Sequence, residues 1–81
     1  RLTFIMELEK LREVIAGVLS VDPNEIEPET TFMEDLGADS LDVYQIIMGI
    51  EEAFDIEIPV DKAEQITTVE EAVNLIRSIM E

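Results

Sequence analysis

Apolar residues recur every three or four positions in three stretches of this chain, and this helical spacing constrains the fold more than any other feature of the sequence. The stretches cover residues 7–20, 39–54 and 69–80. A period of 3.6 residues places such side chains on one face of a helix, which then needs a partner to bury it. The pattern therefore predicts an all-α fold, a small four-helix bundle with three main helices and one short helix.

The connection after the first stretch contains residues that end and restart helices. Val21-Asp22-Pro23-Asn24 ends the first helix, because proline disfavours helical geometry in the residue before it. A long loop then leads to Asp39. Within it, Thr31-Phe32-Met33-Glu34 has the spacing of a capping box on one short turn, with Gly37 as its stop. Loops of this length in compact domains are commonly functional.

The two later helix starts are marked by proline and threonine. Pro59 suits the first residue of a single-turn helix that runs to about Gln65. Thr67-Thr68 precedes Glu70-Glu71 with capping-box spacing, which predicts the start of the last helix.

The chain has 81 residues and a mass of 9.2 kDa, which suits a single domain over residues 1–81. Two interpretations of the N-terminus stay open: either Met6 is the native start and residues 1–5 are a remnant or an extension, or Phe4 and Ile5 pack as structure. Apolar runs are far shorter than the roughly 20 residues that cross a bilayer, and no secretory leader is evident. We expect a cytoplasmic monomer without membrane insertion.

Charge and side-chain chemistry exclude most other classes of function. Five Lys and Arg against twenty Asp and Glu give a formal charge of −15, which opposes nucleic-acid binding and favours basic partners. Residues 13–61 hold fourteen acids and no base, a formal charge of −14. Cys and His are absent, which removes disulfides, thiolate nucleophiles, the usual zinc ligands and a neutral-pH proton shuttle. We predict no catalytic residues and no metal site.

The stretch 39–54 has two apolar faces instead of one. The wider face suits the core and comprises Val43, Ile46, Ile47, Ile50, Ala53 and Phe54. The second face comprises Leu41, Tyr44 and Met48 and points roughly 140° away from the first. Acidic residues, among them Glu51 and Glu52, flank it. Two interpretations stay open at this point: docking against a basic groove with apolar pockets, or burial under the long loop.

Ser40 opens the same stretch, and its surroundings leave two roles open. No His or Cys is present to activate it as a hydrolytic nucleophile, and a serine at a helix start is most often a cap. A phosphate ester on Ser40 would instead lie near free backbone N–H groups and the positive end of the helix. Asp39 and Asp42 would repel it, so a phosphodiester with one charge fits better than a dianionic monoester.

Several motifs together resemble the acyl carrier proteins of bacterial-type fatty acid synthesis. They are Gly37-Ala38-Asp39-Ser40-Leu41-Asp42, Ile50-Glu51-Glu52-Ala53-Phe54, Glu57-Ile58-Pro59 and Ile66-Thr67-Thr68-Val69, and the likeness covers about residues 7–80. The resemblance implies a phosphoprotein that carries acyl intermediates as thioesters on a 4′-phosphopantetheine arm, which comes from coenzyme A and is attached to Ser40. It also implies an interior acyl pocket, and the expected lining residues are Ile46, Ile50, Ala53 and Ile66.

By the same resemblance, the second helix meets a phosphopantetheinyl transferase and fatty acid synthesis enzymes through their basic docking patches. The residues expected to contact them are Asp39, Leu41, Asp42, Tyr44, Met48, Glu51 and Glu52. Gln45 stands where the family often has an acid, and Tyr44 where a smaller aliphatic residue is usual, which leaves partner preference open. Two alternatives remain: a carrier for a specialised pathway (polyketide, lipid A-type or D-alanyl transfer), and a small acidic calcium-binding or interaction domain.

Overall fold

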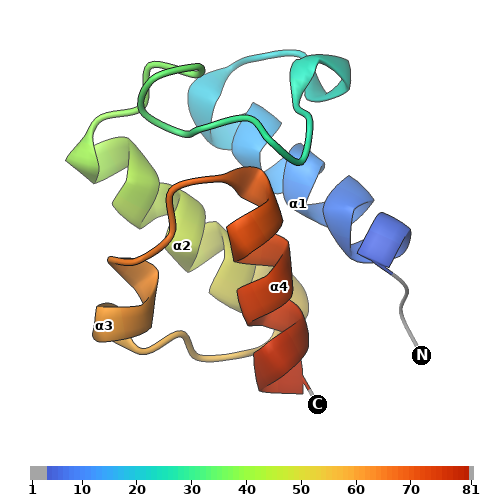
Figure 1. Ribbon diagram of the computed structural model, residues 1–81, viewed down its shortest axis with the longest axis vertical. Helices are drawn as coiled ribbons and strands as arrows, with labels where there is room; N and C mark the ends of the chain where they lie inside the picture. The colour runs from blue at the N-terminus through green and yellow to red at the C-terminus, as the bar shows by residue number, and fades with distance from the viewer. Residues whose placement is uncertain (1–3, 81) are drawn as a thin grey trace.

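A computed structural model describes residues 4–80 and folds them into a bundle of helices (Figure 1). The elements in chain order are α1 (Phe4–Leu19), the 3-10 helix η1 (Pro23–Glu25), α2 (Ser40–Phe54), α3 (Val60–Ala63) and α4 (Val69–Met80). The described residues form no strand element, only one isolated bridge. The predicted all-α bundle of three main helices and one short helix, with a long loop before α2, is confirmed.

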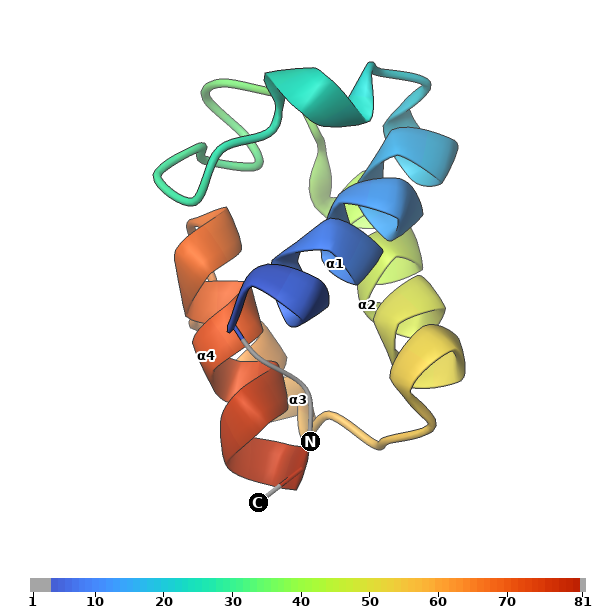
Figure 2. The same ribbon diagram turned by 90° about the vertical axis from the view of Figure 1, so that its right-hand side faces the viewer.

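The three long helices enclose one apolar core. In Figure 2, α4 and α2 lie on either side of α1, and the loop that contains η1 crosses one end of the bundle. Fully buried side chains from all three helices meet there, and they include Leu11, Ile15, Ile46, Ile50, Val73 and Ile76. The helices α1 and α2 approach closely at Gly49, where an added Cβ would lie 2.7 Å from Val14 Cγ1. Only glycine fits this crossing without a shift of its neighbours.

The helix α1 begins three residues before the start that the apolar pattern predicts. Phe4 and Ile5 form its first turn, and Phe4 packs against the core. Glu7 is 3% exposed, and its Oε1 lies 3.2 Å from Nε of Arg77 on α4. The ion pair joins α1 to α4, two helices far apart in the sequence. The spacing of apolar residues within one helix therefore does not reveal it. Of the segment 1–5, residues 1–3 lie outside the described residues.

The long loop before α2 is tied to the segment that precedes α4. Residues 30–32 lie antiparallel to residues 67–69 around an isolated pairing of Thr31 with Thr68. Two backbone hydrogen bonds join the segments, from the Phe32 N–H to Thr67 O (3.2 Å) and from the Val69 N–H to Thr30 O (2.9 Å). We call these paired segments the bridge. The Phe32 side chain is 3% exposed and anchors the loop to the core.

The capping box predicted at Thr31 is wrong in its acidic partner. The Thr31 N–H and hydroxyl donate to Asp35 Oδ2 at 2.8 and 3.0 Å, and the Asp35 N–H donates to Thr31 Oγ1 at 3.0 Å. Residues 32–36 form turns instead of a helix, and the Thr31 carbonyl accepts from the N–H groups of both Asp35 and Leu36 at 3.3 Å. This turn brings Asp35, four residues after Thr31, to the threonine, whereas the predicted partner Glu34 lies three residues after it.

Capping residues fix both ends of α2. The Asp42 N–H donates to Asp39 Oδ1 at 2.8 Å, and the Asp39 N–H donates to Asp42 Oδ2 at 3.2 Å, which completes a capping box. Asp39 is therefore the cap, and Ser40 is the first helical residue. At the other end, Asp55 adopts left-handed geometry with φ 56° and ψ 51°, and its N–H donates to Glu51 O.

Candidate functional site

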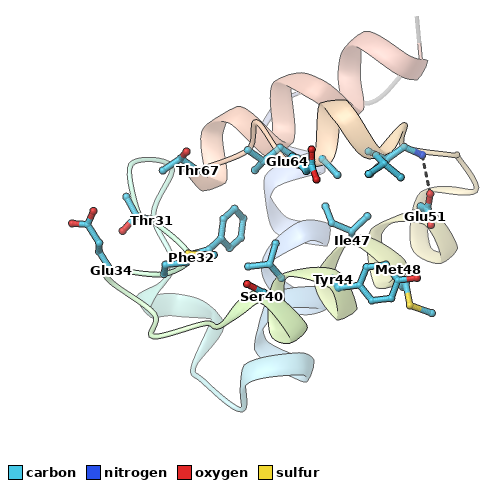
Figure 3. Close-up of a pocket in the computed structure, with 16 residues that line it drawn as sticks. Thr31, Phe32, Glu34, Ser40, Tyr44, Ile47, Met48, Glu51, Glu64 and Thr67 are labelled. Atoms are coloured by element: carbon cyan, nitrogen blue, oxygen red, sulfur yellow. Dashed lines mark hydrogen bonds between the residues drawn. The ribbon is translucent and has the colours of Figure 1, made fainter.

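A cavity of about 690 Å³ runs along one side of α2 (Figure 3). The helix α2 forms one wall, residues 58–67 form the opposite wall, and residues 31–34 close one end. We call this cavity the groove. Its lining residues are Thr31, Phe32, Met33, Glu34, Ser40, Val43, Tyr44, Ile47, Met48, Glu51, Ile58, Val60, Ala63, Glu64, Ile66 and Thr67.

Ser40 lies at the groove end that is nearest to Phe32 (Figure 3). Its side chain is exposed and is not needed as a cap, because Asp39 fills that position. The first hydrogen bond of the helix runs from the Val43 N–H to Asp39 O (3.0 Å), so the N–H groups of Ser40 and Leu41 precede it. An exposed hydroxyl beside these N–H groups, at the positive end of a helix, suits an ester-linked anion.

The floor of the groove is apolar and its rim is polar. Phe32, Ile47 and Ile58 line the groove and are only 3%, 8% and 7% exposed. Their side chains therefore lie between the groove and the core. The carboxylate side chains of Glu51 and Glu64 stand along the rim in Figure 3. This distribution suits an alkyl chain that enters beside Ser40 and lies along α2.

The four residues predicted to line an acyl pocket fall in two different places. Ile66 lines the groove. Ile46 and Ile50 are 1% and 0% exposed in the core between the helices, and neither is among the lining residues. Ala53 packs against that core and is also absent from the lining. The groove therefore lies beside the bundle centre, on the α3 side of α2.

Two of the groove residues that the sequence analysis did not assign to the site, Val43 and Ile47, carry a signal that could have placed them there. Val43 and Ile47 follow Ser40 at i+3 and i+7, so they share its face of the helix. The pattern of apolar residues alone assigns both to the core face, and they lie at the edge of that face nearest α3. Ile58 and Phe32 come from loops, where only the tertiary structure brings them to α2.

The second apolar face of α2 is exposed, and the long loop does not cover it. Leu41, Tyr44 and Met48 are 63%, 63% and 51% exposed. Glu52 beside them is exposed as well. The interpretation that these side chains pack under the loop is thus wrong, because the loop turns toward α4 through the bridge.

The other predicted contact residues have structural bonds of their own. The Asp39 and Asp42 carboxylates accept hydrogen bonds from each other's backbone N–H groups. Glu51 Oε2 accepts a hydrogen bond from the Ile58 N–H at 2.8 Å. Any partner that pairs with these three carboxylates must compete with, or share, a bond within the chain.

Two carboxylates at the bridge have shifted pKa values. Hydrogen bonds from the Thr31 backbone and then from its hydroxyl lower the pKa of Asp35. Hydrogen bonds from the backbone N–H groups of Thr68 and Thr67 lower the pKa of Glu71. Each bond favours the ionised form, so both ends of the bridge are held by charged carboxylates at neutral pH.

Neither a metal centre nor a membrane span is found in residues 4–80. No three acidic side chains there converge in a way that could hold a metal ion. None of the helices in this part of the chain is long and apolar enough to cross a bilayer.

Three matches to known proteins, one from each kind of comparison, agree with one another. A family profile described as phosphopantetheine attachment site matches residues 9–76. An acyl carrier protein of Rubrobacter xylanophilus is 55% identical over 69 residues, which cover 85% of either chain. A solved structure of a proposed acyl carrier protein from Mycobacterium tuberculosis superposes with a TM-score of 0.84 at 30% identity, over 89% of this chain and 96% of that one.

Proposed function

The chain belongs to the family of acyl carrier proteins, non-catalytic carriers with a phosphopantetheine attachment site, and from this premise we propose that Ser40 bears the 4′-phosphopantetheine arm. The observation that carries the proposal is the position of Ser40, an exposed hydroxyl at the first residue of α2 that also lines the end of an apolar groove. The arm, when attached, supplies the thiol that this cysteine-free chain lacks.

The local charges suit a phosphodiester at Ser40. The N–H groups of Ser40 and Leu41 and the positive end of α2 favour an anion there. Asp39 and Asp42 oppose it, although each carboxylate already accepts a backbone hydrogen bond. One added negative charge therefore costs less than the two of a phosphomonoester.

The groove is the proposed shelter for the first part of the acyl chain. It begins beside Ser40 and continues past Val43 and Ile47 to Ile58 and Ile66. Each methylene that leaves water for this apolar floor gains about 0.8 kcal/mol. Because the gain is proportional to buried length, chains that fill the groove are held more firmly than short ones.

The second apolar face of α2, which we call its outer face, is the proposed docking surface for successive enzymes of fatty acid synthesis in the cytoplasm. Exposed Leu41, Tyr44 and Met48 offer apolar contacts, and Glu52 offers charge to a basic patch. The transferase that attaches the arm would use the same face, since Leu41 directly follows Ser40. A carrier of a specialised pathway would share this surface and differ in cargo.

Intact mass spectrometry tests the attachment site. The chain is incubated with coenzyme A, Mg²⁺ and a broad-specificity phosphopantetheinyl transferase. We expect one phosphopantetheinyl increment on the wild type and on Ser78→Ala, a control at an exposed serine of α4. We expect none on Ser40→Ala, which keeps its cap at Asp39. An increment on Ser40→Ala, or none on the wild type with an active transferase, would overturn the proposal.

A further inference from the structure

The groove end farthest from Ser40 is closed by one hydrogen bond. Glu51 Oε2 accepts it from the Ile58 N–H at 2.8 Å, and Figure 3 draws it as a dashed line between α2 and the opposite wall. Both residues line the groove, and the Ile58 side chain is 7% exposed. The bond therefore holds a buried wall residue against α2.

The segment around Ile58 packs on the core through the Ile58 side chain, but in the part of the chain that the structure describes its residues 57–63 make no other hydrogen bond to α2. The N–H groups of Asp55 and Ile56 donate to Glu51 O, which ends the helix. Pro59 has no N–H, and the short helix α3 that follows is bonded back to Pro59 and on to residues 64–66, not to α2. Among the described residues, the Glu51 carboxylate makes the only hydrogen bond between residues 57–63 and α2.

The Glu51 side chain is also within reach of a partner. It is half-exposed, and it follows the exposed Met48 by three positions on α2. Only Oε2 has a hydrogen-bond partner in the described structure. An arginine fork pairs with both oxygens of a carboxylate at once, whereas a lysine acts as a point charge and can use the free oxygen alone.

We propose that Glu51 is a latch on the α3 wall of the groove, and that an arginine of a docked enzyme opens the groove by taking Oε2 from the Ile58 N–H. This inference rests on the proposed function of the groove as the shelter for the acyl chain. Docking on the outer face of α2 then loosens the wall that covers the cargo. The arginine shifts the equilibrium because it binds the open state, with two free oxygens, better than the closed state.

Hydrogen exchange of the Ile58 amide in the protein without its arm tests the latch alone. We expect exchange at least tenfold faster in Glu51→Ala and within about threefold of wild type in Glu51→Gln, whose amide oxygen still accepts a bond. The matched control is Glu52→Ala, which removes an exposed charge next to the latch and should leave Ile58 unchanged. Unchanged exchange in Glu51→Ala would overturn the proposal, and unchanged Ile47 exchange shows that the variant is folded.

Two short peptides test the competition step. At equal saturating concentration, tetra-arginine should speed the exchange of the Ile58 amide in the wild type several-fold, while tetra-lysine should not. No acceleration by tetra-arginine, or the same acceleration by both peptides, would contradict release by a two-oxygen arginine pair.

A loaded protein separates failure of the latch from failure of the proposed function. With an octanoyl thioester on the arm, hydroxylamine should cleave Glu51→Ala several-fold faster than Glu52→Ala. Equal cleavage of the two variants would contradict the latch but would say nothing against attachment of the arm to Ser40. An arm found on Ser40→Ala would contradict the attachment site. The amide exchange of Ile58 would still test the Glu51 hydrogen bond, because it is measured in the protein without its arm.

Discussion

The two ends of the groove are built very differently. Near Ser40, the bridge joins two segments by backbone hydrogen bonds, and the carboxylates of Asp35 and Glu71 each accept hydrogen bonds from one of these segments. At the far end, one hydrogen bond from Ile58 to Glu51 joins the wall to α2. We therefore expect any widening of the groove to begin at the α3 end, where a single hydrogen bond has to break.

The largest expected effect comes from removing the anchor of the bridge. Phe32→Ala should lower the free energy of unfolding by about 3–5 kcal/mol, because a nearly buried aromatic ring is lost from both core and groove. Urea denaturation measures this. Met33→Ala is the matched control, since Met33 is 56% exposed and its loss should cost less than about 0.5 kcal/mol. Similar losses of unfolding free energy in both variants would mean that Phe32 does not anchor the Ser40 end of the groove.

A smaller effect is expected from the cap that joins the bridge to α4. Thr68 Oγ1 accepts from the Glu71 N–H at 3.2 Å, so Thr68→Ala should cost about 1 kcal/mol. Thr67→Ala removes a neighbouring threonine that bonds through its backbone alone, and it should be nearly neutral. Thermal unfolding of both variants checks the difference, and a reversed order would contradict this cap.

Acid should weaken the bridge, because two of its carboxylates have lowered pKa values. The folded-state pKa values of Asp35 and Glu71 are lowered, so their stabilisation is present above their ordinary values of about 4 and is lost as the pH falls through the lowered values. Because relief of the net charge of −15 acts in the opposite direction, the wild type is compared with the double variant Asp35→Asn/Glu71→Gln. The protection factor of the Phe32 amide, which compares its exchange with that of an unfolded chain at the same pH, should fall on acidification in the wild type and change less in the double variant. An equal fall in both proteins would exclude this role.

The smallest effect on stability is expected on the outer face of α2. Glu52→Gln should change the free energy of unfolding by less than about 0.5 kcal/mol, because Glu52 is exposed. The same change should slow arm transfer a few-fold at low salt and less at high salt, since a rim charge acts mainly on association. Rates that do not depend on salt in either protein would remove electrostatic docking from the account.

Local signals in the sequence were enough to predict the helices and the position of Ser40. Asp39 and Asp42 have cap spacing, and Ser40 follows directly. Contacts between distant segments were not predictable in this way. One such contact pairs Glu7 on α1 with Arg77 on α4, and the groove depends on Phe32 and Ile58 being brought to α2 by loops. Ile46 and Ile50, which the resemblance implies at an acyl pocket, are buried in the core and do not line the groove.

Nuclear Overhauser contacts from an octanoyl chain carried on the arm would show whether cargo lies along the Ser40 face of α2. We expect contacts from the acyl chain to the methyl groups of Val43, Ile47 and Ile66, which line the groove. Contacts to Ile46 and Ile50 in the bundle centre, or no methyl contacts at all, would contradict this placement of the cargo.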